Sequence, residues 1–212
     1  MGHRSDPEFL VLHTLRLKGF AQPDAVATTT GLDEADIATT LDKAAGAGHA
    51  QKREGRITGW ALTPAGRSHH AALLQDEVST AGCRDKVDAA YRRFLEINGQ
   101  LLGVCTDWQM RKGPTGDQVL NDHTDAGYDA AVVKRLRAID DAVQPVCADL
   151  ADVLDRFANY GPRLAHAIDR VEAGEVEYAT KPMIDSYHTV WFELHEDLLA
   201  TLGIERSKEG VS

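Results

Sequence analysis

The sequence predicts a mainly α-helical protein in two parts: three helices with a small β-hairpin, followed by an antiparallel helical bundle. Three observations predict this class. Apolar residues recur at helical spacing through most of the chain. The one convincing pair of strand patterns lies within residues 49–62. The segments between the later helices are short, as in antiparallel bundles. We expect the two parts to be residues 1–78 and 79–212.

Capping residues and glycines predict the limits of three N-terminal helices. The expected limits are Asp6 to Gly19, Pro23 to Thr29, and Asp33 to Gly46. The tight turn "TTTGL" joins the second helix to the third. This is a helix-turn-helix layout, whose second helix can lie in the major groove of DNA.

A basic hairpin is expected after the third helix. Residues 49–52 and 57–62 have strand character, and the turn between them reads "REGR". Alternation places Thr58, Trp60 and Leu62 on one face, so we expect Trp60 in the hairpin core. The stretch "LTPAGR" then begins a new helix, with Thr63 as its N-cap.

This order of elements resembles the winged helix-turn-helix domain of MarR-like and PadR-like bacterial transcription regulators. The resemblance covers roughly residues 7–75, and it rests on the three helices, the basic hairpin and "LTPAGR". It implies that residues 34–47 are the recognition helix and residues 52–56 the wing. It also implies double-stranded DNA as the partner, with phosphate contacts supplying most of the affinity. The expected DNA-binding residues are Thr39, Thr40, Lys43, Lys52, Arg53, Arg56 and Arg67.

The charge distribution both supports and limits the expectation of DNA binding. The net charge is −10, but residues 1–70 carry eight basic and eight acidic side chains, so the acidic excess belongs to residues 71–212. A general attraction to nucleic acid is excluded, whereas a local basic patch is not. The third helix opens with Asp33, Glu34 and Asp36. The alternative is therefore an interaction protein that contacts a protein partner through the winged helix and the acidic bundle.

The C-terminal part is expected to be helical throughout. Helices are predicted over residues 84–110, 162–171 and 184–202, with two more within 128–161 that hinge at Gln144-Pro145. Residues 111–127 are expected as a loop without strands. We expect the bundle to form a homodimer, because two half-sites give a regulator useful affinity.

Aromatic residues near the end of the chain suggest a site for a small-molecule effector. His188, Trp191, Phe192 and His195 follow helical spacing along one face. Such a face can line a pocket between helices, although ordinary core or a dimer seam is the alternative. The candidate ligand-binding residues are Trp108, Tyr160, Tyr187, His188, Trp191 and His195.

Signatures of catalysis and of metal binding are absent from the sequence. There is no GxGxxG, GxxxxGK[ST], GxSxG or HExxH motif. Of His123, His188, Glu193, His195 and Glu196, the two histidines on the last helix would stand about 10 Å apart, too far to share one ion. We expect no enzyme activity, no cofactor and no metal site.

The remaining features predict a cytoplasmic protein. No apolar run approaches the roughly 18 residues of a membrane span, and no signal peptide is recognisable. Three widely spaced cysteines are typical of a reducing compartment.

Overall fold

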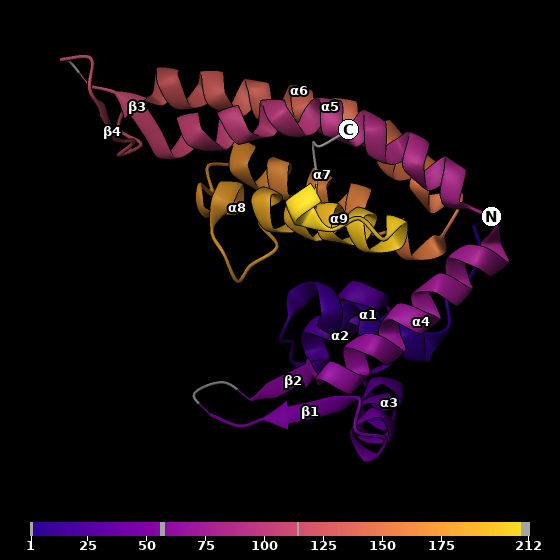
Figure 1. Cartoon of the computed structure of the whole chain (residues 1–212). Helices are drawn as coiled ribbons and strands as arrows, with labels where there is room; N and C mark the ends of the chain where they lie inside the picture. Colours follow the sequence, from indigo (N-terminus) through magenta and orange to yellow (C-terminus); the bar gives the residue numbers. More distant parts are fainter. Residues whose placement is uncertain (1, 56–57, 114, 209–212) are drawn as a thin grey trace. The chain divides into compact units, whose positions relative to one another are not determined.

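The structure consists of helices with two small hairpins (Figure 1). It is a computed structural model that describes residues 2–55, 58–113 and 115–208. A mainly α-helical class, as the sequence predicts, is what these residues show.

Two compact units divide the chain. Unit 1 holds residues 1–85, 152–156 and 196–212, and unit 2 holds residues 86–151 and 157–195. The chain therefore leaves unit 1 and returns to it twice. A single boundary between residues 78 and 79 does not describe this division.

Unit 1 begins with three helices whose limits lie close to the expected ones. They are α1 (Pro7–Lys18), α2 (Pro23–Thr30) and α3 (Glu34–Gly46). The Asp6 carboxylate accepts backbone amides of the first turn of α1, and Asp33 accepts the amide of Ala35 at 2.8 Å. Gly31 ends α2 at φ 70°, a conformation that glycine adopts without strain.

A hairpin and a long helix follow. Strands β1 (Ala50–Arg53) and β2 (Gly59–Leu62) pair antiparallel, and α4 (Pro64–Ala81) starts at the Thr63 N-cap. The backbone of Trp60 exchanges hydrogen bonds of 2.8 and 3.0 Å with Ala21. Trp60 belongs to the apolar cluster formed with α1 and α3, so its predicted place in the core is confirmed.

Segments from the second half of the chain complete unit 1. The backbone of His3 pairs with the segment before η1 (Asp155–Phe157), donating to the Val153 carbonyl at 2.9 Å. Its carbonyl accepts from the Asp155 amide at 3.0 Å. The last turns of α9 (Tyr187–Leu202) and η2 (Arg206–Lys208) also belong to this unit.

Unit 2 is built on long antiparallel helices. These are α5 (Arg84–Gln109), α6 (Ala126–Ala151) and α7 (Tyr160–Glu172), with the first half of α9. Ion pairs join opposite ends of α5 and α6: Asp107 meets Arg135 at 2.5 Å, and Arg93 meets Asp149 at 2.7 Å. These two pairs show that α5 and α6 run antiparallel.

The expected break at Gln144-Pro145 is wrong, because α6 continues through it. Pro145 cannot donate to the carbonyl of Asp141, one turn earlier. Both residues are exposed, so water can donate a hydrogen bond to that carbonyl. An interior proline is therefore tolerated on the solvent side of this helix.

The expectation of a loop without strands over residues 111–127 is also wrong. Strands β3 (Met110–Lys112) and β4 (Gln118–Leu120) pair antiparallel within the predicted loop. Three-residue strands are too short to produce a periodic pattern. The short α8 (Glu177–Thr180) lies between α7 and α9 in the chain.

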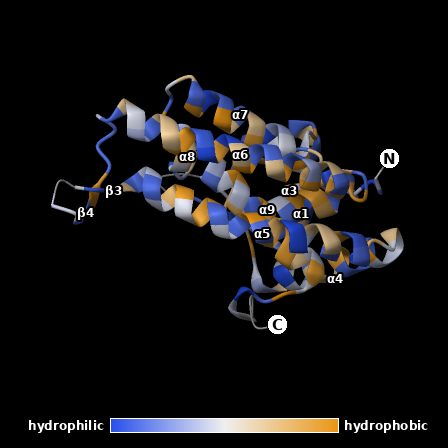
Figure 2. Ribbon diagram, turned by 90° about the horizontal axis from the view of Figure 1, so that it is seen from above, coloured by the Kyte–Doolittle hydropathy of each residue, from blue (hydrophilic) through white to orange (hydrophobic). Residues whose placement is uncertain are grey.

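The long helices carry both hydrophilic and hydrophobic side chains along their length. Figure 2 shows hydrophilic and hydrophobic residues interleaved along α4, α5 and α6. Among the described helices, none combines the length and the apolar character that crossing a membrane requires.

Candidate functional site

One face of α3 packs in unit 1 and the other is exposed. Ile37 and Leu41 are buried, whereas Thr39 and Lys43 are exposed and Thr40 is half-buried. The Thr39 hydroxyl donates to the Ala35 carbonyl at 2.8 Å. The outward positions expected from the sequence are therefore largely the ones that a partner could reach.

The same exposed face is acidic. Glu34, Asp36 and Asp42 are all exposed, against the single basic side chain of Lys43. Asp33 caps the helix through its bond to the Ala35 amide. Carboxylates repel DNA phosphates, so this face alone is a poor DNA-binding surface.

The basic residues that the structure describes in the hairpin lie at exposed positions of β1. Lys52 and Arg53 are exposed, and Lys52 approaches Glu54 at 4.0 Å. Arg56 lies outside the described residues. Strand β1 contacts α3 in unit 1. Arg67 is exposed in the first turns of α4.

The predicted ligand-binding residues are mostly packed against other side chains. Tyr187, Trp191 and His195 are buried on α9, and the Trp191 ring stacks on Phe94 with centroids 4.7 Å apart. Trp191 Nε1 donates to the Asn98 side chain at 2.9 Å. These contacts are those of a bundle core.

The other three candidates lie apart from this stripe. His188 is exposed, so it does not share the buried face of Trp191 and His195. Trp108 is buried at the far end of α5, its ring centroid 4.6 Å from that of His123. Tyr160 is buried beside Phe157.

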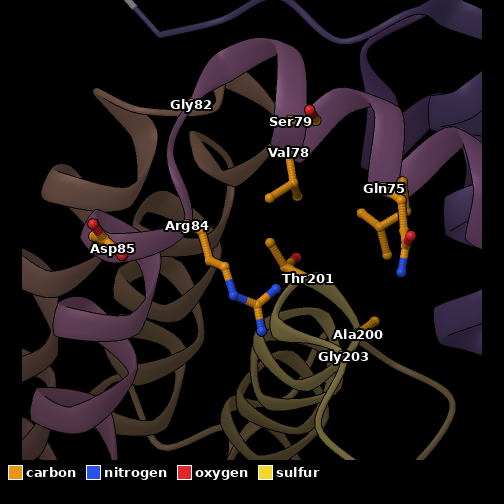
Figure 3. A pocket seen from close by; sticks show the side chains of 10 residues that line it. Gln75, Val78, Ser79, Gly82, Arg84, Asp85, Ala200, Thr201 and Gly203 are labelled. Atoms are coloured by element: carbon orange, nitrogen blue, oxygen red, sulfur yellow. The ribbon is translucent and has the colours of Figure 1, made fainter.

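The larger described cavities are lined by other residues. A cavity of about 470 Å³ in unit 1 lies between the end of α4, the start of α5 and the end of α9 (Figure 3). Arg84 points across it, and its guanidinium donates to the Leu202 carbonyl at 2.7 Å. A second cavity, of about 440 Å³ in unit 2, lies beside β3 and β4. Neither is lined by the six predicted ligand residues.

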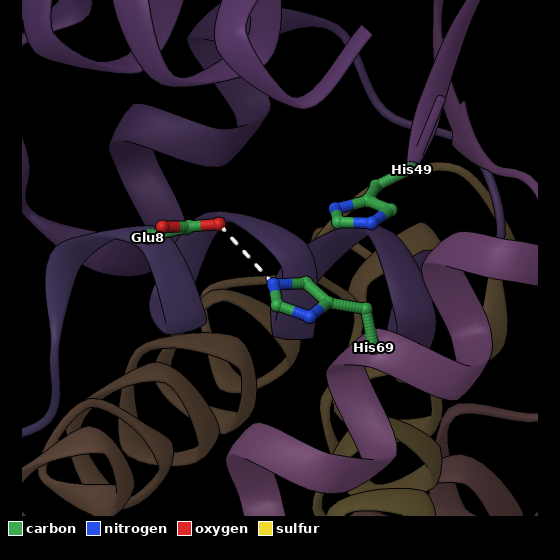
Figure 4. Close-up of side chains that lie close together, drawn as sticks. All are labelled: Glu8, His49 and His69. Atoms are coloured by element: carbon green, nitrogen blue, oxygen red, sulfur yellow. Dashed lines mark hydrogen bonds and ion pairs between the residues drawn. The ribbon is translucent and has the colours of Figure 1, made fainter. Parts of the chain in front are cut away.

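The metal candidates considered in the sequence do not converge. Glu193 pairs with Arg163 at 2.7 Å, Glu196 with Arg206 at 2.9 Å, and His123 with Asp129 at 2.9 Å. A different group of metal-ligating residues does converge. Glu8, His49 and His69 place ligand atoms within 4.8 Å of one another (Figure 4).

A buried charge network forms the polar centre of unit 1. Arg156 donates to Glu77 at 2.8 Å and to the Thr201 hydroxyl at 2.7 Å, and it also pairs with Asp197. His13 Nε2 lies 3.0 Å from the Asp197 carboxylate. The network joins α1, α4, η1 and α9.

Burial and charge shift the pKa values in this network. Burial alone raises the pKa of Asp197, but the charges of Arg156 and His13 outweigh it and hold that pKa below its usual range. Burial, with the nearby charges of His13 and Arg16, lowers the pKa of His70 to about 3. His70 Nε2 is 2.9 Å from His13 Nδ1 and shares a hydrogen bond with it.

Sequence reasoning missed both the network and the Glu8 group. Arg156 is 79 positions from Glu77 and 41 from Asp197. Glu8 and His69 are 61 positions apart. Neither set follows a motif spacing, so only the folded chain brings its members together.

No protein-family model, curated protein or solved structure matches this chain in the comparisons.

Proposed function

We propose that unit 1 contains a winged helix-turn-helix and that the protein is a DNA-binding transcription regulator acting as a homodimer. The observation that carries the proposal is the arrangement of α2, α3 and the hairpin. One side of α3 is packed, its other side is free for a partner, and exposed Lys52 and Arg53 lie on the adjoining strand β1.

The charges of the exposed side chains favour DNA binding in which the hairpin makes the main phosphate contacts. Lys52 and Arg53 supply positive charge for phosphates, which give affinity that is independent of sequence and weakens with salt. Thr39 and Lys43 then contact base edges from α3. A homodimer doubles these contacts, and a small-molecule effector bound in a cavity would control the spacing of the two copies.

The acidic face of α3 favours a second candidate function. Exposed Glu34, Asp36 and Asp42 suit a basic surface on another protein better than they suit DNA. In this alternative the winged helix is an interaction module and binds no operator.

Fluorescence anisotropy separates the two functions. The full-length protein is titrated into its own upstream intergenic DNA and into a scrambled duplex, over a series of salt concentrations. A regulator binds the native duplex more tightly, and both affinities fall with salt. Absence of binding to either duplex at low salt contradicts DNA recognition by the protein alone.

The triple variant Glu34→Gln/Asp36→Asn/Asp42→Asn tests the placement of α3. If α3 lies on DNA, removing three negative charges strengthens binding to both duplexes. Unchanged DNA affinity in this variant contradicts the placement of α3 on DNA and favours the interaction module.

A further inference from the structure

Three metal-ligating side chains converge in unit 1 from three separate elements. Glu8 lies in the first turn of α1, His49 directly precedes β1, and His69 lies in the second turn of α4 (Figure 4). His69 Nε2 is 3.4 Å from Glu8 Oε1. The rings of His49 and His69 stack with centroids 4.1 Å apart.

The backbone holds the two imidazoles close together. The amide of His49 donates to the Ala44 carbonyl at 2.7 Å, and its carbonyl accepts from the Thr63 amide at 3.0 Å. A Cβ at Gly66 would stand 1.8 Å from the His49 carbonyl oxygen, so α4 approaches His49 closely. His69 follows Gly66 by three residues and therefore lies on the same side of α4.

The donor set and its spacing suit zinc and related ions. Zinc binds imidazole nitrogen at about 2.0–2.1 Å, so two ligands of a tetrahedral site stand about 3.3 Å apart. The His69–Glu8 pair already has this separation. The ligand atoms of all three side chains lie within 4.8 Å of one another, so a rotation of the half-buried His49 side chain would bring its nitrogen to the same ion. Two imidazoles with one carboxylate are typical of first-row transition ions rather than of calcium or magnesium.

We propose that Glu8, His49 and His69 bind one divalent transition-metal ion of the zinc class, with water as a further ligand. The Glu8 side chain is 55% exposed and that of His69 is 32% exposed, which leaves room for the water. The ion ties α1 to α4 and to the residue before β1. It thereby fixes the base of the hairpin that carries Lys52 and Arg53. Its effect on DNA affinity rests on the proposed function, whereas metal binding itself does not.

The test is a calorimetric titration of the chelator-treated, full-length protein with Zn²⁺, using protein that carries no histidine tag. We expect one ion per chain. Co²⁺ should add visible absorption bands in the same stoichiometry. Each of Glu8→Gln, His49→Gln and His69→Gln should weaken Zn²⁺ binding by at least about tenfold. His166→Gln, at an exposed histidine of α7, is the matched control and should bind as the unaltered protein does.

Two results would overturn the site: no Zn²⁺ binding by the unaltered protein, or unchanged affinity in His49→Gln/His69→Gln. Circular dichroism of the metal-free variants checks that they fold. If a histidine variant unfolds, the Zn²⁺ affinity of Glu8→Gln tests the site instead, because this exposed side chain can change without loss of core packing. None of these titrations uses DNA. Failure of the metal site can therefore be distinguished from failure of the proposed DNA binding.

Discussion

At the scale of single residues, the buried side chain of Arg156 links three segments of unit 1 through Glu77, Asp197 and Thr201. It is only 2% exposed, and the side chains of Glu77 and Asp197 are 6% and 2% exposed. Buried charges cost several kcal/mol each unless they are paired and hydrogen-bonded. Arg156 meets both carboxylates at once, so removing it takes the guanidinium away from buried Glu77 and leaves His13 as the positive partner of Asp197.

Arg156→Met should therefore lower the free energy of unfolding by about 3–5 kcal/mol. The control is Arg92→Met, whose side chain is 76% exposed in a pair with Asp88. That exposed pair should contribute less than about 0.5 kcal/mol. Urea denaturation followed by circular dichroism measures both values. A loss below about 1 kcal/mol in Arg156→Met would contradict the role of the network.

His70 should make stability depend on pH. The unfolded chain binds a proton at His70 near pH 6.5, but burial lowers the folded pKa to about 3. Because the unfolded state binds more protons between these values, stability falls as the pH drops from 6.5 toward 3, by up to about 1.4 kcal/mol per pH unit. Asp197 stays ionised above pH 4.5, since its folded pKa is lowered.

Urea denaturation at pH 7 and at pH 4.5 measures this dependence. His70→Gln keeps a hydrogen-bonding side chain for His13 but cannot titrate. Its stability should change less between the two pH values. Equal changes in the variant and the unaltered protein would show that His70 is not the source.

At the scale of elements, the close approach of another backbone segment to α4 leaves no space for a side chain at Gly66. Gly66→Ala at the start of α4 places a Cβ 1.8 Å from the His49 carbonyl, so it should destabilise by more than about 2 kcal/mol. Gly99→Ala in α5 meets open space and should stabilise by about 0.5–1 kcal/mol. Thermal unfolding measures the change in stability of each variant. If both substitutions destabilise the protein, or both stabilise it, the prediction is contradicted.

The hairpin has its own prediction. Lys52→Ala/Arg53→Ala should weaken binding to all duplexes and reduce the slope of log affinity against log salt by about 2, at roughly 0.9 per phosphate contact. Lys86→Ala/Lys134→Ala removes the same charge from exposed positions of unit 2 and controls for net charge. Anisotropy with both duplexes measures the slopes. Equal slopes in the two variants would place the DNA contacts elsewhere.

At the scale of the whole molecule, unit 1 depends on chain segments that are far apart. Deleting residues 196–212 removes Asp197, Thr201 and the buried Leu198 from it. Each fully buried leucine contributes about 1.5–3 kcal/mol, and the deletion also leaves Arg156 without Asp197. Hydrogen exchange in α1 and α4 should therefore become fast. Deleting only residues 206–212, which follow the exposed Glu205, should leave exchange in α1 and α4 slow.

Local chemistry in the sequence predicted most elements of unit 1. Asp6, Asp33 and Thr63 cap helices because a side-chain oxygen satisfies amides only a few residues away. The place of Trp60 in the core also followed from alternation along one strand. These signals act over one or two turns, so they can be read without knowing the fold.

Local patterns along the chain were sufficient to predict the mainly helical class, the helix limits near the N-terminus and the basic hairpin strand. The folded chain was needed to show that residues 152–156 and 196–212 join unit 1, that α6 continues through Pro145, and which side chains meet. Arg156 meets Glu77 across 79 positions of the chain, and Glu8 meets His69 across 61. Such encounters depend on how whole helices pack, and no periodicity within a segment records that packing.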